Sequence, residues 1–487
     1  MTRLVVLALA VTLLIQHRAW AGEFTVHVPS ELATIQQAIN VAPPLDFEII
    51  VAPGTYNEAI DSLGKSFHLR SSGGPEVTII DASGLGASVV TVTDADSASP
   101  AMVIEGFTIT GGDAGQGGGM FIQNASPTVV DCIFVNNSAA LSGGAIYTDS
   151  ANPTITGCTF ENNSAPSGGA IRSSNGFVTV TSSIFLSNAA NHGGAMHISG
   201  GSNANIDGCT FESNEAVEIG DLVGLLGGAI LIEGTTSAEI VDSEFRDNTA
   251  SIGGGIANFA DGFFVLNTHF EDNSAGNGGG VFHSSALGSI NGSTFANNTA
   301  DQSGGGIFIT PESAPIGLGG NFFCANQPDD VSGPSNQHQN EFSDSCDVTY
   351  HVPDDYPTIQ QAIDDSANGT VIVVAPGTYN EPIDTAGVVV YLQSSGGPEN
   401  TIINVGGMGT SAITIANGEG PDTIIEGFTF TGGQAQFGGG MLIDGTSPTV
   451  IDCIFINNMA TIGGGIAVIN GGSVQIPGDA FIQNNTA

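Results

Sequence analysis

The sequence predicts an all-β protein folded as a parallel β-helix solenoid, with about 25 residues in each rung and short N-terminal capping helices. Three observations support this prediction. A glycine pair followed by an aliphatic residue recurs along the chain, and a Phe-x-x-Asn motif follows each pair at a near-constant distance. Such a short fixed period indicates one supersecondary unit stacked many times. Glycine pairs and β-branched residues also oppose helix formation, and neither a helical period nor frequent hairpin turns are present.

Residues 1–21 have the pattern of a secretory signal peptide. Arg3 provides a positive end, residues 5–15 are apolar, and Ala19-Trp20-Ala21 is a cleavage site of the A-x-A type. The apolar run is too short to span a bilayer comfortably, and no later stretch is long and apolar enough to do so. We therefore expect a secreted or cell-surface protein with no transmembrane segment after the signal peptide.

The charge balance is strongly acidic, with 6 basic and 48 acidic residues and a net charge of −42. So few basic side chains cannot form the patch that binding to nucleic acid or to an anionic membrane surface needs. The charge is compatible with cation binding or a saline habitat, but its simplest role is to keep an exported protein soluble. The hydrophobic content of 41% argues against disorder.

A short capping helix is predicted at the start of each of two related segments. The first helix has Ser30 as its predicted N-cap. The second has Asp354 or Asp355 as its cap, with Ile359 and Ile363 on its apolar face. Such a helix would cover the exposed edge of the first rung. The predicted apolar face of the first helix consists of Leu32, Ile35 and Ile39.

Each rung divides into three short strands, as residues 143–163 illustrate. The residue five before each Phe is aliphatic, as Ile155 is, and the residue two before is small, as Cys158 is. Side chains alternate along a strand, so a step of three cannot keep both residues on one face. A bend must therefore lie between them, and Thr156-Gly157 has the composition of one.

Stacked rungs place equivalent residues above one another, about 4.8 Å apart. Phe would stack on Phe inside, and the Asn of each motif would form a column whose side-chain amides bond from rung to rung. We interpret these residues as structural turn residues and not as ligands. The motif recurs late in the chain as Phe455/Asn458 and Phe481/Asn484. The predicted column consists of Asn137, Asn163, Asn188, Asn214, Asn248, Asn273 and Asn298.

The chain contains a duplication. Residues 22–347 form the first predicted module, and residues 348–487 form a second copy that we expect to be truncated. The sequence APGTYNE at residues 52–58 returns at residues 375–381, together with the TIQQAI segment before it.

These motifs resemble known proteins. Gly-Gly-Ala-Ile at residues 143–146 and 168–171, with Phe-x-x-Asn, resembles the repeats of polymorphic outer-membrane proteins and the right-handed parallel β-helix superfamily of pectate lyases. TIQQAI followed by APGTYNE resembles the opening of pectinesterases, which carries no catalytic residue in that family. The first resemblance implies a right-handed β-helix.

The chain departs from the catalytic motifs of those enzyme families. The mature sequence has no Trp, and a lyase-type proton acceptor could come only from Lys65, Arg70, Arg172 or Arg246. We therefore expect a non-catalytic protein that acts in adhesion or binds a polysaccharide or cell-surface glycan. The alternative is a polysaccharide lyase or carbohydrate esterase with a divergent site. A groove with two or more acids beside Arg172 or Arg246 would favour the enzyme.

The cysteines suggest one disulfide. Cys324 and Cys346 flank the irregular end of the first module, and we predict that they bond. Cys132 and Cys158 occupy one ladder position on neighbouring rungs, where either a disulfide or two buried thiols would fit.

No cofactor is expected. Acidic pairs in loops have the oxygen ligands that calcium prefers, but none has EF-hand spacing, and solvated side chains are the default interpretation. The candidate pairs are Asp94/Asp96, Asp329/Asp330 and Asp354/Asp355. His192 and His197 flank one glycine pair and could face each other. We expect function where the period breaks, in the insert with Glu215, Glu218 and Asp221 and in residues 327–345.

Overall fold

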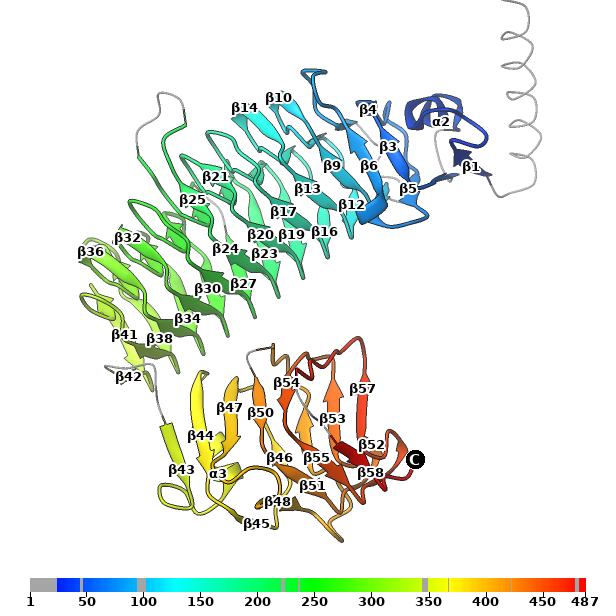
Figure 1. Cartoon of the computed structure of the whole chain (residues 1–487). Helices are drawn as coiled ribbons and strands as arrows, with labels where there is room; N and C mark the ends of the chain where they lie inside the picture. Colours follow the sequence, from blue (N-terminus) through cyan, green and yellow to red (C-terminus); the bar gives the residue numbers. More distant parts are fainter. Residues whose placement is uncertain are drawn as a thin grey trace, which may run out of the picture. The chain divides into compact units, whose positions relative to one another are not determined.

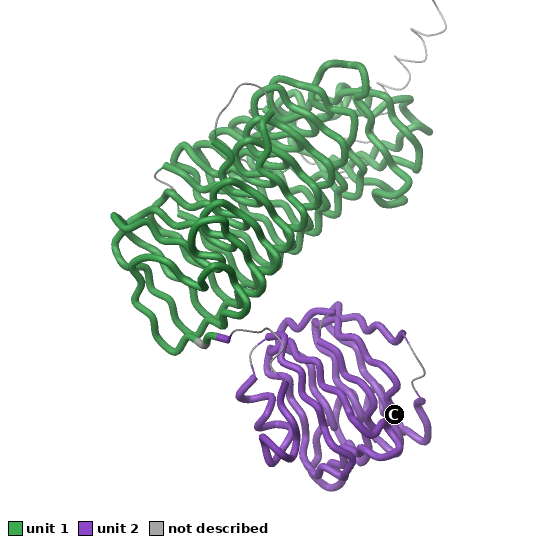
Figure 2. The backbone as a smooth tube through the Cα atoms, turned by 60° about the vertical axis from the view of Figure 1, so that its left-hand side comes forward, with its two compact units in different colours: residues 1–342 green, residues 343–487 purple. Residues whose placement is uncertain are grey.

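The computed structural model describes residues 24–43, 47–93, 102–219, 224–234, 237–343, 349–366, 368–421, 423–477 and 481–487. The predicted signal peptide lies outside these residues. The chain divides into two compact units, residues 1–342 and 343–487, close to the expected boundary after residue 347 (Figure 2). Each unit is a stack of short parallel strands, which confirms the predicted β-solenoid (Figure 1).

Three long parallel sheets, here called sheets 1, 2 and 3 in chain order, form the faces of unit 1. Sheet 1 contains β1 (Phe24–Val28), β2 (Phe47–Val51), β5 (His68–Ser71), β8 (Val103–Glu105), β12 (Thr128–Val130), β16 (Thr154–Thr156), β19 (Phe177–Thr181), β23 (Asn203–Asp207), β27 (Ala238–Val241), β30 (Phe263–Leu266), β34 (Gly288–Asn291), β38 (Ile316–Gly319) and β41 (Ser335–His338).

Sheet 2 contains β3 (Gly54–Tyr56), β6 (Thr78–Asp81), β9 (Thr108–Thr110), β13 (Ile133–Val135), β17 (Thr159–Glu161), β20 (Ile184–Leu186), β24 (Thr210–Glu212), β28 (Glu244–Arg246), β31 (His269–Glu271), β35 (Thr294–Ala296), β39 (Phe322–Cys324) and β42 (Glu341–Ser343). Sheet 3 contains β4 (Ile60–Asp61), β7 (Val90–Thr93), β11 (Met120–Gln123), β15 (Ile146–Asp149), β18 (Ile171–Ser174), β22 (Met196–Ser199), β26 (Ile230–Ile232), β29 (Ile256–Asn258), β33 (Val281–His283), β37 (Ile307–Ile309) and β40 (Val331–Ser332).

Short strand pairs form where sheet 2 turns toward sheet 3. They are β10 (Asp113–Gln116) with β14 (Ser138–Ser142), β21 (Ala189–Ala190) with β25 (Glu215–Ala216), and β32 (Ser274–Asn277) with β36 (Thr299–Ser303). A short 3-10 helix, η2 (Pro75–Val77), precedes β6.

Unit 2 repeats the arrangement in a shorter stack. Its three main sheets and one short pair are β43 (Thr349–Val352), β44 (Thr370–Val374), β47 (Val390–Ser394), β50 (Ile424–Glu426) and β54 (Thr449–Ile451); β45 (Gly377–Tyr379), β48 (Thr401–Asn404), β51 (Thr429–Thr431), β55 (Ile454–Ile456) and β58 (Phe481–Gln483); β46 (Ile383–Asp384), β49 (Ile413–Ile415), β53 (Met441–Asp444) and β57 (Ile466–Ile469); and β52 (Gln434–Phe437) with β56 (Met459–Ile462).

The core of unit 1 contains a column of stacked phenylalanine rings. Each ring is fully buried, and successive ring centroids lie 4.6 to 5.0 Å apart. The predicted bend is present as well: Ile155 and Cys158 both point inward, and Gly157 between them has a φ of +63°. The column consists of Phe134, Phe160, Phe185, Phe211, Phe245, Phe270, Phe295 and Phe323.

The glycine pairs are required by two different constraints. The first glycine of a pair has a left-handed backbone, as Gly168 does with a φ of +64°. The second glycine packs directly against the next rung, because a Cβ on Gly169 would lie 2.0 Å from the carbonyl oxygen of Gly194. The pair therefore marks a close approach between the backbones of neighbouring rungs.

Both capping helices start later than predicted. Helix α2 (Ile35–Val41) is capped by Thr34, whose hydroxyl accepts from Gln37 N at 3.1 Å, and not by Ser30. The chain around Ser30 is in a turn, since the amides of Glu31 and Leu32 donate to the His27 carbonyl. Leu32 packs against the core but precedes the helix.

The second copy shows the same correction. Helix α3 (Ile359–Asp364) is capped by Thr358, and not by Asp354 or Asp355. Asp355 accepts instead from the amide of His351 at 2.7 Å.

The glutamate of the repeated APGTYNE motif caps the N-terminus of each helix. The Glu58 carboxylate accepts from the first amides of α2, Ile35 N at 2.8 Å and Gln36 N at 2.9 Å. Glu381 does the same for the first two amides of α3. A carboxylate at a helix N-terminus satisfies amides that lack a partner within the helix. The motif is therefore structural.

The motif at Phe481/Asn484 is out of register with the others. Ile482 pairs with Phe455 in the ladder, so Phe481 lies one position away from the phenylalanine column and is exposed. Asn485, and not Asn484, accepts from Asn458. The sequence interpretation of this motif was wrong, because the ladder here is continued by the next residue.

Candidate functional site

The predicted asparagine column forms a continuous hydrogen-bonded ladder. Asn188 Nδ2 donates to Phe160 O at 2.9 Å and to Asn214 Oδ1 at 3.0 Å, and its Oδ1 accepts from the Asn163 backbone amide and side chain, both at 3.0 Å. Each of these asparagines is buried. Because their amide groups are already used within the stack, they have no capacity left for a ligand.

A hollow of about 490 Å³ lies on the outer face of sheet 1, across β19, β23, β27 and β30. We call it the aromatic hollow. Two phenylalanine rings stand on it with large exposed fractions, Phe177 at 41% and Phe264 at 47%. Polar groups occupy the space between them. Its lining consists of Phe177, Asn203, Ala204, Asn205, Ser237, Glu239 and Phe264.

The strand register sets the geometry of the aromatic hollow. Phe177 pairs with Asn203 on the next rung, and Asn205, Glu239 and Phe264 stand in one column on three successive rungs. Rungs are about 4.8 Å apart, so the rungs of Phe177 and Phe264 are separated by about 14 Å. Asn203 is fixed by accepting from Ser237 N at 2.9 Å. The hollow therefore presents two apolar rings and polar groups along the stack.

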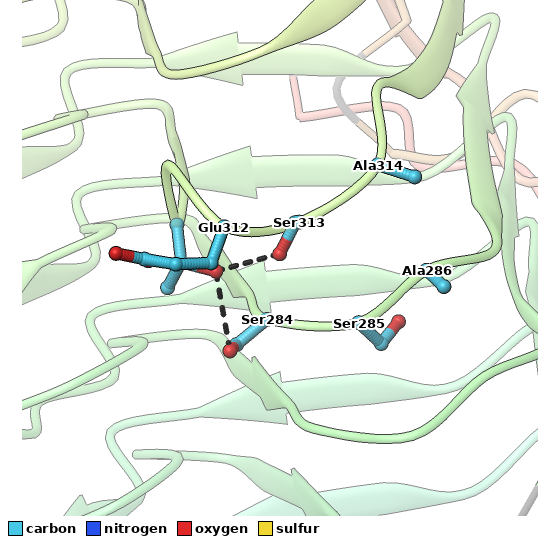
Figure 3. A pocket seen from close by; sticks show the side chains of 7 residues that line it. Ser284, Ser285, Ala286, Glu312, Ser313 and Ala314 are labelled. Carbon is cyan, nitrogen blue, oxygen red and sulfur yellow. Dashed lines mark hydrogen bonds between the residues drawn. The ribbon is translucent and has the colours of Figure 1, made fainter.

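A second hollow, of about 240 Å³, is lined by hydroxyl groups (Figure 3). Thr310 Oγ1 bonds to Ser313 Oγ at 2.6 Å and to Ser284 Oγ at 3.2 Å. Ser285 Oγ lies 3.2 Å from Nε2 of the buried His283, and burial lowers the pKa of that imidazole to about 4. Most polar groups of this hollow bond to one another, which leaves it less able to bind a ligand than the aromatic hollow.

The outer face of sheet 3 carries a cluster that we call the His197 cluster: Ser167, Arg172, His197, Ser199 and Glu233. Ser167 Oγ lies 2.7 Å from His197 Nδ1, and Glu233 Oε1 lies 3.0 Å from His197 Nε2. Arg172 donates to the carbonyl of His197 at 3.3 Å and to Ser199 Oγ.

The electrostatics of this cluster follow from burial. Desolvation, with a smaller effect of the Arg172 charge, lowers the pKa of His197 to about 4 despite the opposing hydrogen bond with Glu233. The same hydrogen bond lowers the pKa of Glu233. At neutral pH the cluster therefore contains a neutral imidazole and a carboxylate, with the Nε2 proton donated to Glu233.

The sequence identified part of this cluster. His192 and His197 do face each other, edge to face, with ring centroids 5.9 Å apart. Arg172 lies beside them. Ser167 and Glu233 were missed because neither stands near His197 in the sequence. The one available signal was that Ser167 precedes a glycine pair at the position that His192 occupies on the next rung.

The insert that breaks the period approaches the cluster. A Cβ on Gly224 would lie 4.0 Å from His192 Nε2, and Ile219 N donates to Asn191 Oδ1 at 3.1 Å. Glu215 begins β25 and Glu218 is exposed, whereas Asp221 lies outside the described residues. The irregular stretch at residues 327–345 contains β40, β41 and β42.

The other basic candidates are engaged in structural contacts. Lys65 donates to three carbonyls at the end of α2, and Arg70 pairs with Glu48 at 2.5 Å. Arg246 has two acids beside it, as the enzyme alternative requires, but Glu244 and Glu271 form ion pairs with it along the strand face. Its guanidinium is thus neutralised within sheet 2, away from both hollows described above.

The cysteines fall into two classes. Cys132, Cys158, Cys209 and Cys453 are free, buried thiols, so Cys132 and Cys158 are unbonded neighbours that fill the core. A hydrogen bond with Cys132, together with burial, raises the pKa of Cys158. Cys324 is disulfide-bonded. Cys346 lies outside the described residues, so its pairing with Cys324 stays a prediction.

Within the described part of the chain, no three His, Cys, Asp or Glu side chains gather as a metal site. Asp329 and Asp330 accept from Gly304 N and Asn326 Nδ2, and Asp94 and Asp96 lie outside the described ranges. Calcium binding therefore stays a prediction. In the same described part, no helix has the length and apolarity to cross a membrane.

Comparisons with known proteins support the fold. Residues 67–236 match the model of the right handed beta helix region, and residues 292–310 match the Chlamydia polymorphic membrane protein repeat. A search of curated sequences finds no significant match.

Several solved structures are distantly similar. An alginate lyase from Paenibacillus sp. str. FPU-7 has 13% identity and a TM-score of 0.34 over 66% of this chain and 99% of its own. A PL6 family alginate lyase, AlyGC, has 12% identity and a TM-score of 0.29 over 95% of this chain and 80% of its own. The catalytic domain of a GH87 alpha-1,3-glucanase has 12% identity and a TM-score of 0.29 over 66% of this chain and 68% of its own. Likenesses this weak carry no argument about activity. On the family models and the strand topology, the chain is a right-handed parallel β-helix protein that carries a repeat of the polymorphic membrane protein type.

Proposed function

We propose that this protein is exported to the cell surface and binds uncharged glycans along the outer face of sheet 1, at the aromatic hollow. The observation that carries the proposal is the pair of exposed rings, Phe177 and Phe264, with polar side chains between them. Single exposed apolar residues are common on proteins and need no explanation. Two rings in one hollow, separated by Asn205 and Glu239, are the arrangement of a binding surface.

The chemistry of the hollow suits a sugar chain. A pyranose ring has an apolar face of C–H groups and a rim of hydroxyls. The Phe rings provide apolar surface for the first, and Asn203, Asn205 and Glu239 provide donors and acceptors for the second. The two rings stand about 14 Å apart along the stack, which favours an extended oligosaccharide over a single sugar.

The negative charge of the chain disfavours acidic glycans. With a net charge of −42, the protein repels polymers of uronic acids or sulfated sugars. Glu239 adds a negative group to the hollow itself. Uncharged glycans are therefore the favoured class. Export is supported by the signal-like residues 1–21 and by the match to a membrane protein repeat.

Binding by the mature protein tests this proposal. A glycan array identifies an uncharged oligosaccharide, and calorimetry then compares the wild type with Phe177→Ala and Phe264→Ala. Each truncation should weaken binding about 5- to 30-fold, which corresponds to about 1–2 kcal/mol of lost ring contact. Phe481→Ala, which removes an exposed ring from unit 2, is the matched control and should leave the affinity unchanged. Binding confined to acidic glycans, or equal affinities for all four proteins, would refute the proposal.

A further inference from the structure

Ser167, His197 and Glu233 form a continuous chain of hydrogen bonds on three successive rungs. The hydroxyl lies 2.7 Å from one imidazole nitrogen, and the carboxylate lies 3.0 Å from the other. His197 has a side-chain exposure of only 4%, whereas Glu233 is half-exposed and Ser167 is half-buried. The imidazole is thus held between the hydroxyl of a half-buried serine and a half-exposed carboxylate.

The fold positions each member separately. Ser167 stands immediately before the Gly168-Gly169 turn, His197 lies within β22, and Glu233 directly follows β26. Glu233 N donates to Ile198 O at 3.0 Å, which fixes the Glu233 backbone against β22. Arg172 pairs with His197 in the strand register and donates to its carbonyl, so it acts as a positioning residue for the imidazole.

We propose that Ser167, His197 and Glu233 constitute a hydrolytic centre that cleaves carboxylic esters of small acyl groups. Hydrolysis goes beyond the binding proposed for sheet 1 and does not depend on it. A serine hydroxyl bonded to a histidine that is oriented by a carboxylate is recognised by geometry and roles, on any fold. Here the serine meets Nδ1 and the acid meets Nε2. In the usual triad the serine bonds to Nε2 and the acid to Nδ1, so the roles of the two nitrogens are reversed here. One nitrogen still accepts the serine proton, and the other is still held by the carboxylate.

The reaction balances with water as the only co-reactant. Ser167 Oγ attacks the carbonyl carbon of the ester, and its proton moves to His197 Nδ1. The bond from that carbon to the alcohol oxygen then breaks, and the alcohol leaves with the proton from Nδ1. Water attacks the acyl-serine, gives a proton to Nδ1, and releases the carboxylic acid as that proton returns to Ser167. Glu233 stays ionised throughout and stabilises the imidazolium.

Burial determines the size of the substrate. His197 is almost inaccessible, and the insert reaches His192 beside it. A bulky acyl group cannot enter such a site, whereas an acetyl-sized group needs only the accessible side of Ser167. The neutral imidazole that burial maintains is the state that can accept the serine proton.

Active-site labelling of the mature protein tests the proposal without any variant. A fluorophosphonate probe, followed by peptide mass mapping, should modify Ser167, and the protein should hydrolyse p-nitrophenyl acetate. Absence of the label from Ser167 in the wild type would overturn the proposal, whatever the fate of glycan binding.

Variants then separate catalysis from structure. Ser167→Ala and His197→Gln should each lower the hydrolysis rate about 100-fold or more and abolish labelling. Ser142→Ala is the matched control, because Ser142 precedes the Gly143-Gly144 pair at the equivalent place on another rung, and it should keep both signals. Circular dichroism checks that each variant is folded. Equal hydrolysis by the wild type and a folded Ser167→Ala would also overturn the proposal.

Discussion

Replacing Asn188 by alanine tests the asparagine ladder at its centre. The side chain donates two hydrogen bonds, to Phe160 O and Asn214 Oδ1, and accepts two more from Asn163. Each buried hydrogen bond contributes about 1 kcal/mol net, and a buried group left without a partner costs about 1–3 kcal/mol more. The substitution removes all four bonds and leaves the buried backbone amide of Asn163 without its acceptor. The four bonds sum to about 4 kcal/mol and the unpaired amide adds about 1–3 kcal/mol, so we expect a loss of about 5–7 kcal/mol in the free energy of unfolding.

Urea denaturation followed by circular dichroism measures this loss as a shift in the unfolding midpoint. Asn205→Ala is the matched control, because Asn205 lies on the outer face of sheet 1, and its removal should change the free energy by less than about 0.5 kcal/mol. A change below about 1 kcal/mol for Asn188→Ala would refute our assignment of the ladder as a main source of rung cohesion.

Three further predictions follow from individual contacts. Gly169→Ala places a methyl group 2.0 Å from Gly194 O, so it should lower the thermal midpoint sharply, whereas Gly115→Ala, with no atom within 4 Å, should not. Burial lowers the pKa of folded His197 from 6.5 to about 4, so as the pH falls the unfolded chain binds this proton first. The stability present above pH 6.5 is therefore lost progressively as the pH falls toward 4. Thermal melts across this range should show a loss of up to about 3 kcal/mol in the free energy of unfolding, and His197→Gln should make that loss smaller. Mass mapping under non-reducing conditions should find Cys324 bonded to Cys346 and the other four cysteines unreactive to alkylation until the protein unfolds; two free thiols at Cys324 and Cys346 would contradict the pairing.

The inward positions of the fold could be predicted residue by residue. Ile155, Cys158 and Phe160 recur at fixed spacing because the interior of every rung has the same width and must be filled in the same way. The bends follow from the same constraint. The helix caps were predicted wrongly because Ser30 and Asp355 have the right chemistry for a cap. Only the turn that precedes the first helix shows that its cap lies four residues after Ser30, at Thr34, and that the helix begins at Ile35.

The period, the parallel β-helix and the structural role of its most regular residues could all be predicted from the sequence, because equal spacing along the chain becomes vertical stacking in any solenoid. The right-handed sense was implied by the resemblance to known repeats and is supported by the family match. Only the tertiary structure decided which outward side chains meet. Burial imposes no period on the outer face, and neighbours there are a full rung or more apart in sequence, as Ser167 and Glu233 are from His197. The 34-residue rung that holds the insert shifts this spacing further, so that Asn214 bonds to Asn248 across it. For this reason, the aromatic hollow and the His197 cluster became visible only once the strand register was known.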